Sequence, residues 1–157
     1  MQPGRKRWNY CIDAVAGLDV HKETVVACLR PADGKVTTEV RTFQTTTADL
    51  LRLSAWLAEN DSTHVAMEAT GVYWKPVWHI LDDGDFVLVL ANAAHVKNVP
   101  GRKTDVNDAM WSSELLAHGL IRASFVPDTQ TQEMRNLLRT RKQLDDRFHG
   151  TSHGMEP

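Results

Sequence analysis

Two predicted strands of the chain end in an acidic residue. Asp19 ends an apolar run over residues 14–20, and Glu68 lies at the end of another over residues 64–69. In an α/β sheet, the carboxyl ends of the strands face the crevice where ligands bind. Either acid alone is more typical of a turn or a cap than of a catalyst. Together they make this edge of the sheet a candidate site.

Two further acids are three residues apart in a helix predicted over residues 104–118. Asp105 and Asp108 would therefore point the same way, although acids are also common in any first helical turn. Four carboxylates in one cleft repel one another unless a cation offsets them. Oxygen ligands favour Mg²⁺ or Mn²⁺. Such ions stabilise the attacking and leaving oxygens in nucleases and strand-transfer enzymes.

The elements that must position these acids follow a recognisable order. Strands are expected over residues 14–20, 24–30, 36–43, 64–69 and 86–90, and helices over residues 47–60, 73–81, 93–99, 104–118 and 130–144. Three consecutive strands followed by strand–helix–strand crossovers predict a mixed sheet with helices on its faces. The predicted fold is therefore α/β and ribonuclease H-like, followed by a helical extension.

Composition narrows the classes of protein that fit. The 157 residues carry 18 Lys and Arg against 20 Asp and Glu, a net charge of −2, which excludes a wholly basic nucleic-acid coat. The longest apolar run is too short to cross a bilayer, and no secretory signal follows the basic start. Cys11 and Cys28 lack CxxC spacing, which favours reduced thiols. We expect a cytoplasmic protein without membrane association.

Three segments carry a family resemblance. They are Gly-Leu-Asp-Val-His-Lys at 17–22, Met-Glu-Ala-Thr-Gly at 67–71 and Lys-Thr-Asp-Val-Asn-Asp-Ala at 103–109. Over about residues 14–144 the chain resembles the DEDD-type insertion-sequence transposases (the IS one-ten family), whose catalytic core is similar to the resolvase RuvC. The resemblance implies a catalytic tetrad that binds Mg²⁺ or Mn²⁺, formed by Asp19, Glu68, Asp105 and Asp108. It also implies action on DNA and a guide RNA as partner.

Basic residues near the motifs are the candidates for nucleic-acid binding. Lys103 lies beside Asp105 and would approach a phosphate, Lys22 is a second candidate, and Lys97 and Arg102 belong to the same basic stretch as Lys103. Arg102 and Lys103 fit a solvated loop equally well. Among the aromatic residues, only Tyr73 and Trp74 are candidates for contact with nucleic acid.

The family resemblance also sets expectations for domain organisation. We expect a basic segment at 1–13, the catalytic domain at 14–127, the start of a helical extension at 128–144 and a disordered, aberrant tail at 145–157. Family members continue into a second domain with a catalytic serine, so the tail suggests a truncation or frameshift scar and a chain inactive alone. The extension would expose Met134, Leu137 and Leu138, which predicts self-association or binding to full-length transposase.

Three functions remain open from the sequence. The first is a truncated transposase domain that carries out metal-dependent DNA cleavage and strand transfer. The second is a non-catalytic remnant or inhibitor that binds DNA, guide RNA or a full-length transposase. The third is a self-sufficient RuvC-like junction nuclease. His21 is expected to be an orienting or surface residue, and Asn107 a capping residue.

Overall fold

The computed structural model describes residues 14–31, 38–69, 71–101 and 107–150. The chain divides into two compact units, residues 1–124 and residues 125–157. The first unit contains all of the strands and helices α1 to α4, and the second contains helix α5. No helix within the described ranges combines the length and apolar character needed to cross a membrane.

The first unit is built around a five-stranded mixed sheet. Its strands are β1 (Ala14–Val20), β2 (Thr24–Arg30), β3 (Glu39–Gln44), β4 (Ser62–Glu68) and β5 (Val87–Ala91), in the spatial order β3-β2-β1-β4-β5. The first three form an antiparallel meander, and β4 and β5 add in parallel to β1. Parallel β1, β4 and β5 end at the same edge of the sheet, which is where the strand-end acids lie.

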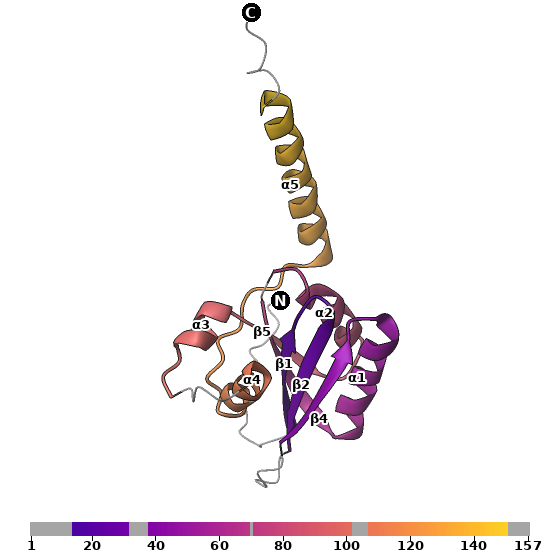
Figure 1. Ribbon diagram of the computed structural model, residues 1–157, viewed down its shortest axis with the longest axis vertical. Coiled ribbons are helices and arrows are strands. Elements are labelled where there is room, and N and C mark those ends of the chain that lie inside the picture. The colour runs from indigo at the N-terminus through magenta and orange to yellow at the C-terminus, as the bar shows by residue number, and fades with distance from the viewer. Residues whose placement is uncertain (1–13, 32–37, 70, 102–106, 151–157) are drawn as a thin grey trace, which may run out of the picture. The chain divides into compact units, whose positions relative to one another are not determined.

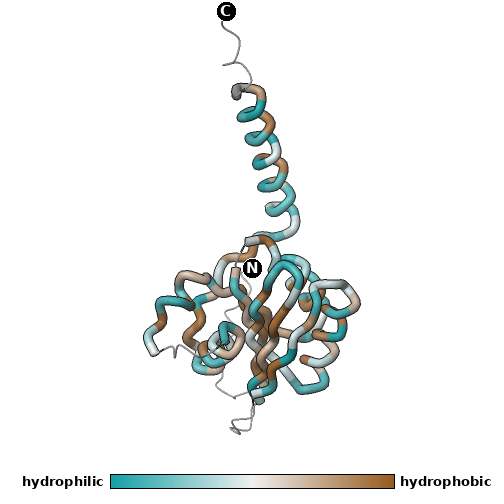
Figure 2. The backbone as a smooth tube through the Cα atoms, in the orientation of Figure 1, coloured by the Kyte–Doolittle hydropathy of each residue, from teal (hydrophilic) through white to brown (hydrophobic). Residues whose placement is uncertain are grey.

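Helices cover both faces of the sheet (Figure 1). Helices α1 (Thr47–Glu59) and α2 (Trp74–Asp82) lie on one side, and α4 (Asp108–Ala117) lies on the other. The short helix α3 (Ala93–Asn98) is tied to α4, because the Trp111 indole N–H donates to the Val96 carbonyl at 3.0 Å. The central strands are correspondingly apolar (Figure 2).

Alternation along the strands determines which residues face α4. Val15, Ala66 and Val89 form one buried cluster with Leu116 of α4. Because successive strand residues point to opposite faces, Gly17 and Asp19 share this face with Val15, and Glu68 shares it with Ala66. Two of the predicted site acids therefore lie on the side of the sheet that α4 covers.

Helix α4 approaches β1 very closely at Gly17. A Cβ atom added there would overlap the Ala109 carbonyl oxygen and would lie 2.5 Å from the Ser113 nitrogen. Only glycine allows backbone to pack on backbone at this distance. The glycine therefore fixes the position of the first turns of α4 above β1.

The predicted order of elements is confirmed, with two corrections. The helix expected from Thr104 begins instead at Asp108, after Asn107 in an extended conformation (ψ 144°), whereas Asp105, expected in the same helix, lies outside the described residues. Helix α5 (Thr129–Gly150) continues past Leu144, so the disorder expected from residue 145 is wrong for 145–150. No proline or glycine interrupts 145–149, and Arg141 pairs with Asp145 one turn on, at 3.9 Å.

Candidate active site

Asp19 and Glu68 lie on neighbouring strands at matching positions. The register between β1 and β4 aligns Leu18 with Met67, so the next residue on each strand is one of the acids. Both belong to the face covered by α4. Glu68 is only 9% exposed, whereas the Asp19 side chain remains 21% exposed. The strand ends thus place two carboxylates side by side, one deeper than the other.

Asp108 approaches the same edge from α4. Ala109 and Ser113 of this helix pack on Gly17, while Leu116 packs on Val15, so α4 runs antiparallel to β1. The N-terminal end of α4 therefore lies toward the carboxyl end of β1, where Asp19 is located. As the first residue of α4, Asp108 is brought to this edge by the packing of the helix on the sheet.

The fourth predicted ligand belongs to a segment outside the described part of the chain. Asp105 lies outside the described residues, as do Arg102 and Lys103. Within the described ranges, no three His, Cys, Asp or Glu side chains form a group that could hold a metal ion. Asp19, Glu68 and Asp108 thus approach one edge from three elements without forming a closed ligand set among themselves.

His21 contacts the more exposed of the two strand-end acids. Its Nε2 atom lies 3.0 Å from Oδ2 of Asp19. The backbone of His21 is fixed by the tight β1–β2 turn, in which its N–H donates to the Thr24 carbonyl at 2.8 Å. The imidazole can therefore orient the Asp19 carboxylate while remaining largely exposed.

Two of the predicted DNA-binding lysines are described, and both are exposed. Lys22 follows His21 in the β1–β2 turn, and Lys97 lies on α3. The aromatic residues divide clearly between core and surface. Trp56, Trp74 and Trp111 are buried and Trp78 is partly buried, whereas Tyr73 is 44% exposed, so of the two candidates for contact with nucleic acid only Tyr73 is accessible.

Gly17 is a site-forming residue that the sequence motifs alone did not assign. Its only sequence signal is a glycine inside a buried apolar strand, which often marks a close backbone approach. Cys28 pairs with Gly17 across the β1–β2 ladder, and the Ser113 hydroxyl lies 3.5 Å from its sulfur. Burial raises the pKa of the Cys28 thiol above its ordinary value, which keeps it neutral. This thiol thus belongs to the packing beneath α4.

Asn107 caps α4, as predicted, because its side-chain oxygen accepts from the Ala109 N–H at 2.8 Å. We expect Asn107→Ala to lower the free energy of unfolding by about 1 kcal/mol, the usual loss for a removed cap. Urea denaturation monitored by circular dichroism would measure it. Asn107→Ser keeps a capping oxygen and should retain most of the stability. Equal losses in both variants would contradict a capping role.

The sheet order, the mixed strand directions and the acid-bearing strand ends define a ribonuclease H-like α/β domain with a carboxylate edge. The profile of the DEDD transposases of the IS110 type, described as "Transposase", matches residues 16–153. The chain belongs to this transposase family. The match includes residues 145–153, so the prediction that the family pattern ends near residue 144 is wrong.

Solved structures of resolvases resemble the chain in fold. RuvC of Thermus thermophilus in complex with a Holliday junction substrate is 11% identical, with a TM-score of 0.48 over 71% of this chain and 99% of that one. A second Thermus thermophilus RuvC structure is 13% identical with the same score and coverage. The fowlpox virus resolvase in complex with Holliday junction DNA is 9% identical, with a TM-score of 0.42 over 68% of this chain and 97% of that one. No curated protein matches the chain.

Proposed function

We propose that this chain is the metal-dependent domain of a transposase that cleaves DNA strands and takes part in strand transfer. Membership of the transposase family supports action on DNA. The observation that carries the proposal is the register of β1 and β4, which sets Asp19 beside Glu68 on the face covered by α4. Asp108, at the start of α4, supplies a third carboxylate at the same edge.

The proposed cofactor is Mg²⁺ or Mn²⁺. The donor set fits a hard divalent cation, because Asp19, Glu68, Asp105 and Asp108 offer only carboxylate oxygens. Such a cation would polarise a phosphodiester and activate the attacking oxygen. The residues of the chain would bind this cation and orient the DNA beside it. His21 would orient the Asp19 carboxylate, and Gly17 together with Asn107 would fix the position of the start of α4. The DNA phosphates would be contacted by basic side chains, namely Lys22, Lys97, Arg102 and Lys103.

Two parts of the family's reaction would come from outside these 157 residues. By resemblance, the attacking serine belongs to a second domain and the target is chosen with a guide RNA. The chain described here would supply the carboxylate half of a site completed by that serine. Strand transfer by this chain alone is therefore not expected, and the resemblance implies a chain inactive alone. Hydrolytic cleavage of a strand, in which water replaces the serine as the attacking group, would need only the carboxylates and the metal, and it is the activity that we propose for this chain.

The alternative is a non-catalytic protein that binds DNA, guide RNA or a full-length transposase. One observation favours it. Among the described side chains, no group of three ligands meets to hold a metal. A non-catalytic binder would keep the fold and its exposed lysines without needing that group to close.

DNA cleavage by the purified chain in Mg²⁺ or Mn²⁺ separates these functions. We expect cleavage of one strand that is lost with EDTA and lost in Asp19→Ala. DNA binding without cleavage in either metal would overturn the proposal and favour the non-catalytic protein. Cleavage confined to four-way junctions, without any serine adduct, would instead identify a self-sufficient junction nuclease.

Self-association is proposed for α5. Met134, Leu137, Leu138, Leu144 and Phe148 are exposed on this helix, and apolar positions recur along it (Figure 2). Spacings of three, seven and four residues place Met134, Leu137, Leu144 and Phe148 on one stripe, with Arg141 at the position between Leu137 and Leu144, which is the heptad pattern of a coiled-coil seam with one charged position. We expect Leu137→Lys to shift a concentration-dependent assembly toward monomer in sedimentation experiments. Gln143→Lys, off the stripe, should leave it unchanged, and a monomeric wild type would contradict the proposal.

A further inference from the structure

Of two adjacent aromatic residues that follow Glu68, one is buried and the other is exposed. Trp74 is 8% exposed and packs edge-on against Trp78, with 6.0 Å between ring centroids. Tyr73 is 44% exposed, and its neighbour Val72 is 53% exposed. The Tyr73 ring lies 3.8 Å from where a Cβ of Gly71 would be, so the loop supports the ring from one side. Trp74 therefore belongs to the core, whereas the exposed ring of Tyr73 is accessible to a binding partner.

A single unpaired cation accompanies this tyrosine. The segment 44–94 is strongly acidic, with seven Asp and Glu against only Arg52 and Lys75. Arg52 is already engaged, because its guanidinium lies 2.7 Å from Asp49. Among the described residues of this segment, Lys75 is therefore the Lys or Arg side chain for which no ion pair is found. A lysine without an ion pair is available to contact a phosphate.

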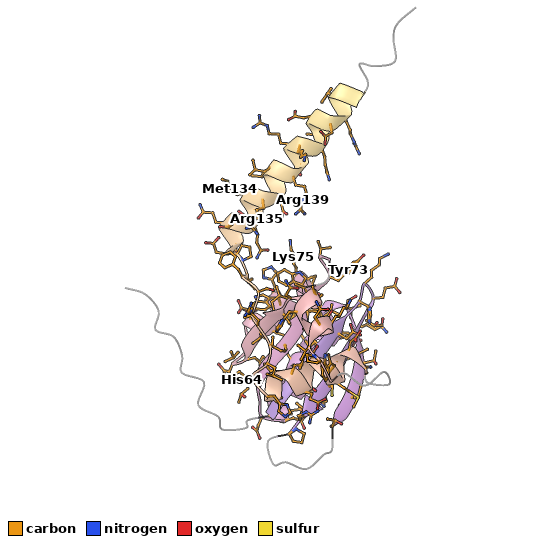
Figure 3. The ribbon with its side chains drawn as sticks, turned by 90° about the vertical axis from the view of Figure 1, so that its left-hand side faces the viewer. His64, Tyr73, Lys75, Met134, Arg135 and Arg139 are labelled. Atoms are coloured by element: carbon orange, nitrogen blue, oxygen red, sulfur yellow. The ribbon has the colours of Figure 1, made fainter. Side chains whose placement is uncertain are left out.

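Both residues lie at the end of the sheet that carries the acids. Figure 3 shows Tyr73 and Lys75 at the end of the first unit opposite His64, which lies near the start of β4. Glu68 ends the same strand, five residues before Tyr73. Five residues span at most about 17 Å, so the Cα atoms of Glu68 and Tyr73 lie no farther apart than that.

We propose that Tyr73 stacks on an unpaired base of the DNA beside the carboxylate edge, and that Lys75 contacts a phosphate of the same strand. An exposed ring next to a cation is the combination that binds single strands without sequence readout. With at most about 17 Å between their Cα atoms, Tyr73 and Glu68 can contact the same DNA strand. The inference rests on the proposed function for the presence of DNA at this edge.

The test uses single-stranded DNA with one 2-aminopurine, a base whose fluorescence is quenched by stacking. In EDTA the wild-type chain is expected to quench it on binding. Tyr73→Ala should lose the quenching and bind about tenfold more weakly or worse, and Tyr73→Phe should keep both within about twofold. Lys75→Ala should keep the quenching but reduce the salt dependence of binding by about one phosphate contact.

Two matched variants control for general effects on the surface. Leu51→Ala removes a similarly exposed apolar side chain from α1, and Arg52→Ala removes the other basic residue of the acidic segment; neither should change binding. The proposal would be overturned if Tyr73→Ala quenched 2-aminopurine as strongly as the wild type. It would also be overturned if Tyr73→Ala lost the quenching only with RNA of the same sequence and not with DNA. Because the measurement is made in EDTA, the quenching depends neither on a bound metal nor on cleavage. An absence of cleavage would therefore not contradict base stacking by Tyr73, and an absence of quenching would not contradict cleavage.

Discussion

Replacing Gly17 with alanine is expected to destabilise the first unit by about 3 kcal/mol, the upper end of the range for an overpacked core. The added methyl group would overlap the Ala109 carbonyl oxygen and lie 2.5 Å from the Ser113 nitrogen. Both contacts are with backbone, which cannot rotate away as a side chain can. Relief requires α4 to move away from β1.

The contact between the added methyl group and the α4 backbone makes Gly17→Ala destabilising, which is the opposite of what strand propensity alone predicts. Alanine is normally favoured over glycine inside a strand by about 0.5–1 kcal/mol, because glycine loses more backbone entropy on folding. The loss from overpacking exceeds that gain here. Urea denaturation followed by circular dichroism would measure the difference in the free energy of unfolding.

Gly84→Ala provides a matched control. A Cβ atom at Gly84 would meet chiefly the ring of Phe86, a side chain that can rotate, while the nearest backbone atom, the Leu81 carbonyl oxygen, lies 3.3 Å away. We expect a change in stability below about 1 kcal/mol. A similar small change in Gly17→Ala would contradict the close packing of α4 on β1. A large loss in Gly17→Ala should also weaken metal binding, because the shifted helix carries Asp108 away from Asp19.

Much of the fold could be predicted, because each element carries its own pattern. The buried strands 14–20 and 24–30 and the capped helix after Thr46 depend on local signals, and the structure has them at those residues. The start of α4 could not be predicted from local signals, because the sequence offers two possible capping residues. Thr104 and Asn107 are both good capping residues, three positions apart, and in the structure Asn107 is the one that caps α4, through the Ala109 N–H.

The candidate site was predictable in residue type but not in arrangement. Acids at strand ends indicated Asp19 and Glu68, yet their alignment depends on the pairing of Leu18 with Met67, which involves strands distant in sequence. The exposure of Tyr73 and the burial of Trp74 depend on the α2 packing against its neighbours. Adjacent aromatic residues give no sequence signal that separates the two.

Neutral replacement of the aligned acids is expected to have the largest effect on function. Asp19→Asn and Glu68→Gln keep size and one oxygen but remove the charge that holds a divalent cation. Each should lower the rate of Mg²⁺-dependent DNA cleavage by about 10³-fold. The double variant should be little worse than either single variant, because residues that act as one unit are not additive. Cleavage rates under single-turnover conditions would measure all three.

Stability distinguishes this loss from damage to the fold. Asn and Gln keep the size of the acids and an oxygen that can accept a hydrogen bond, so both variants should unfold within about 1 kcal/mol of the wild type. Asp82→Asn removes an exposed acid at the end of α2 and should cleave normally. Independent, multiplying losses at Asp19 and Glu68 would indicate two separate roles. Rates within tenfold of the wild type would show that the aligned carboxylates do not hold the metal that cleavage requires.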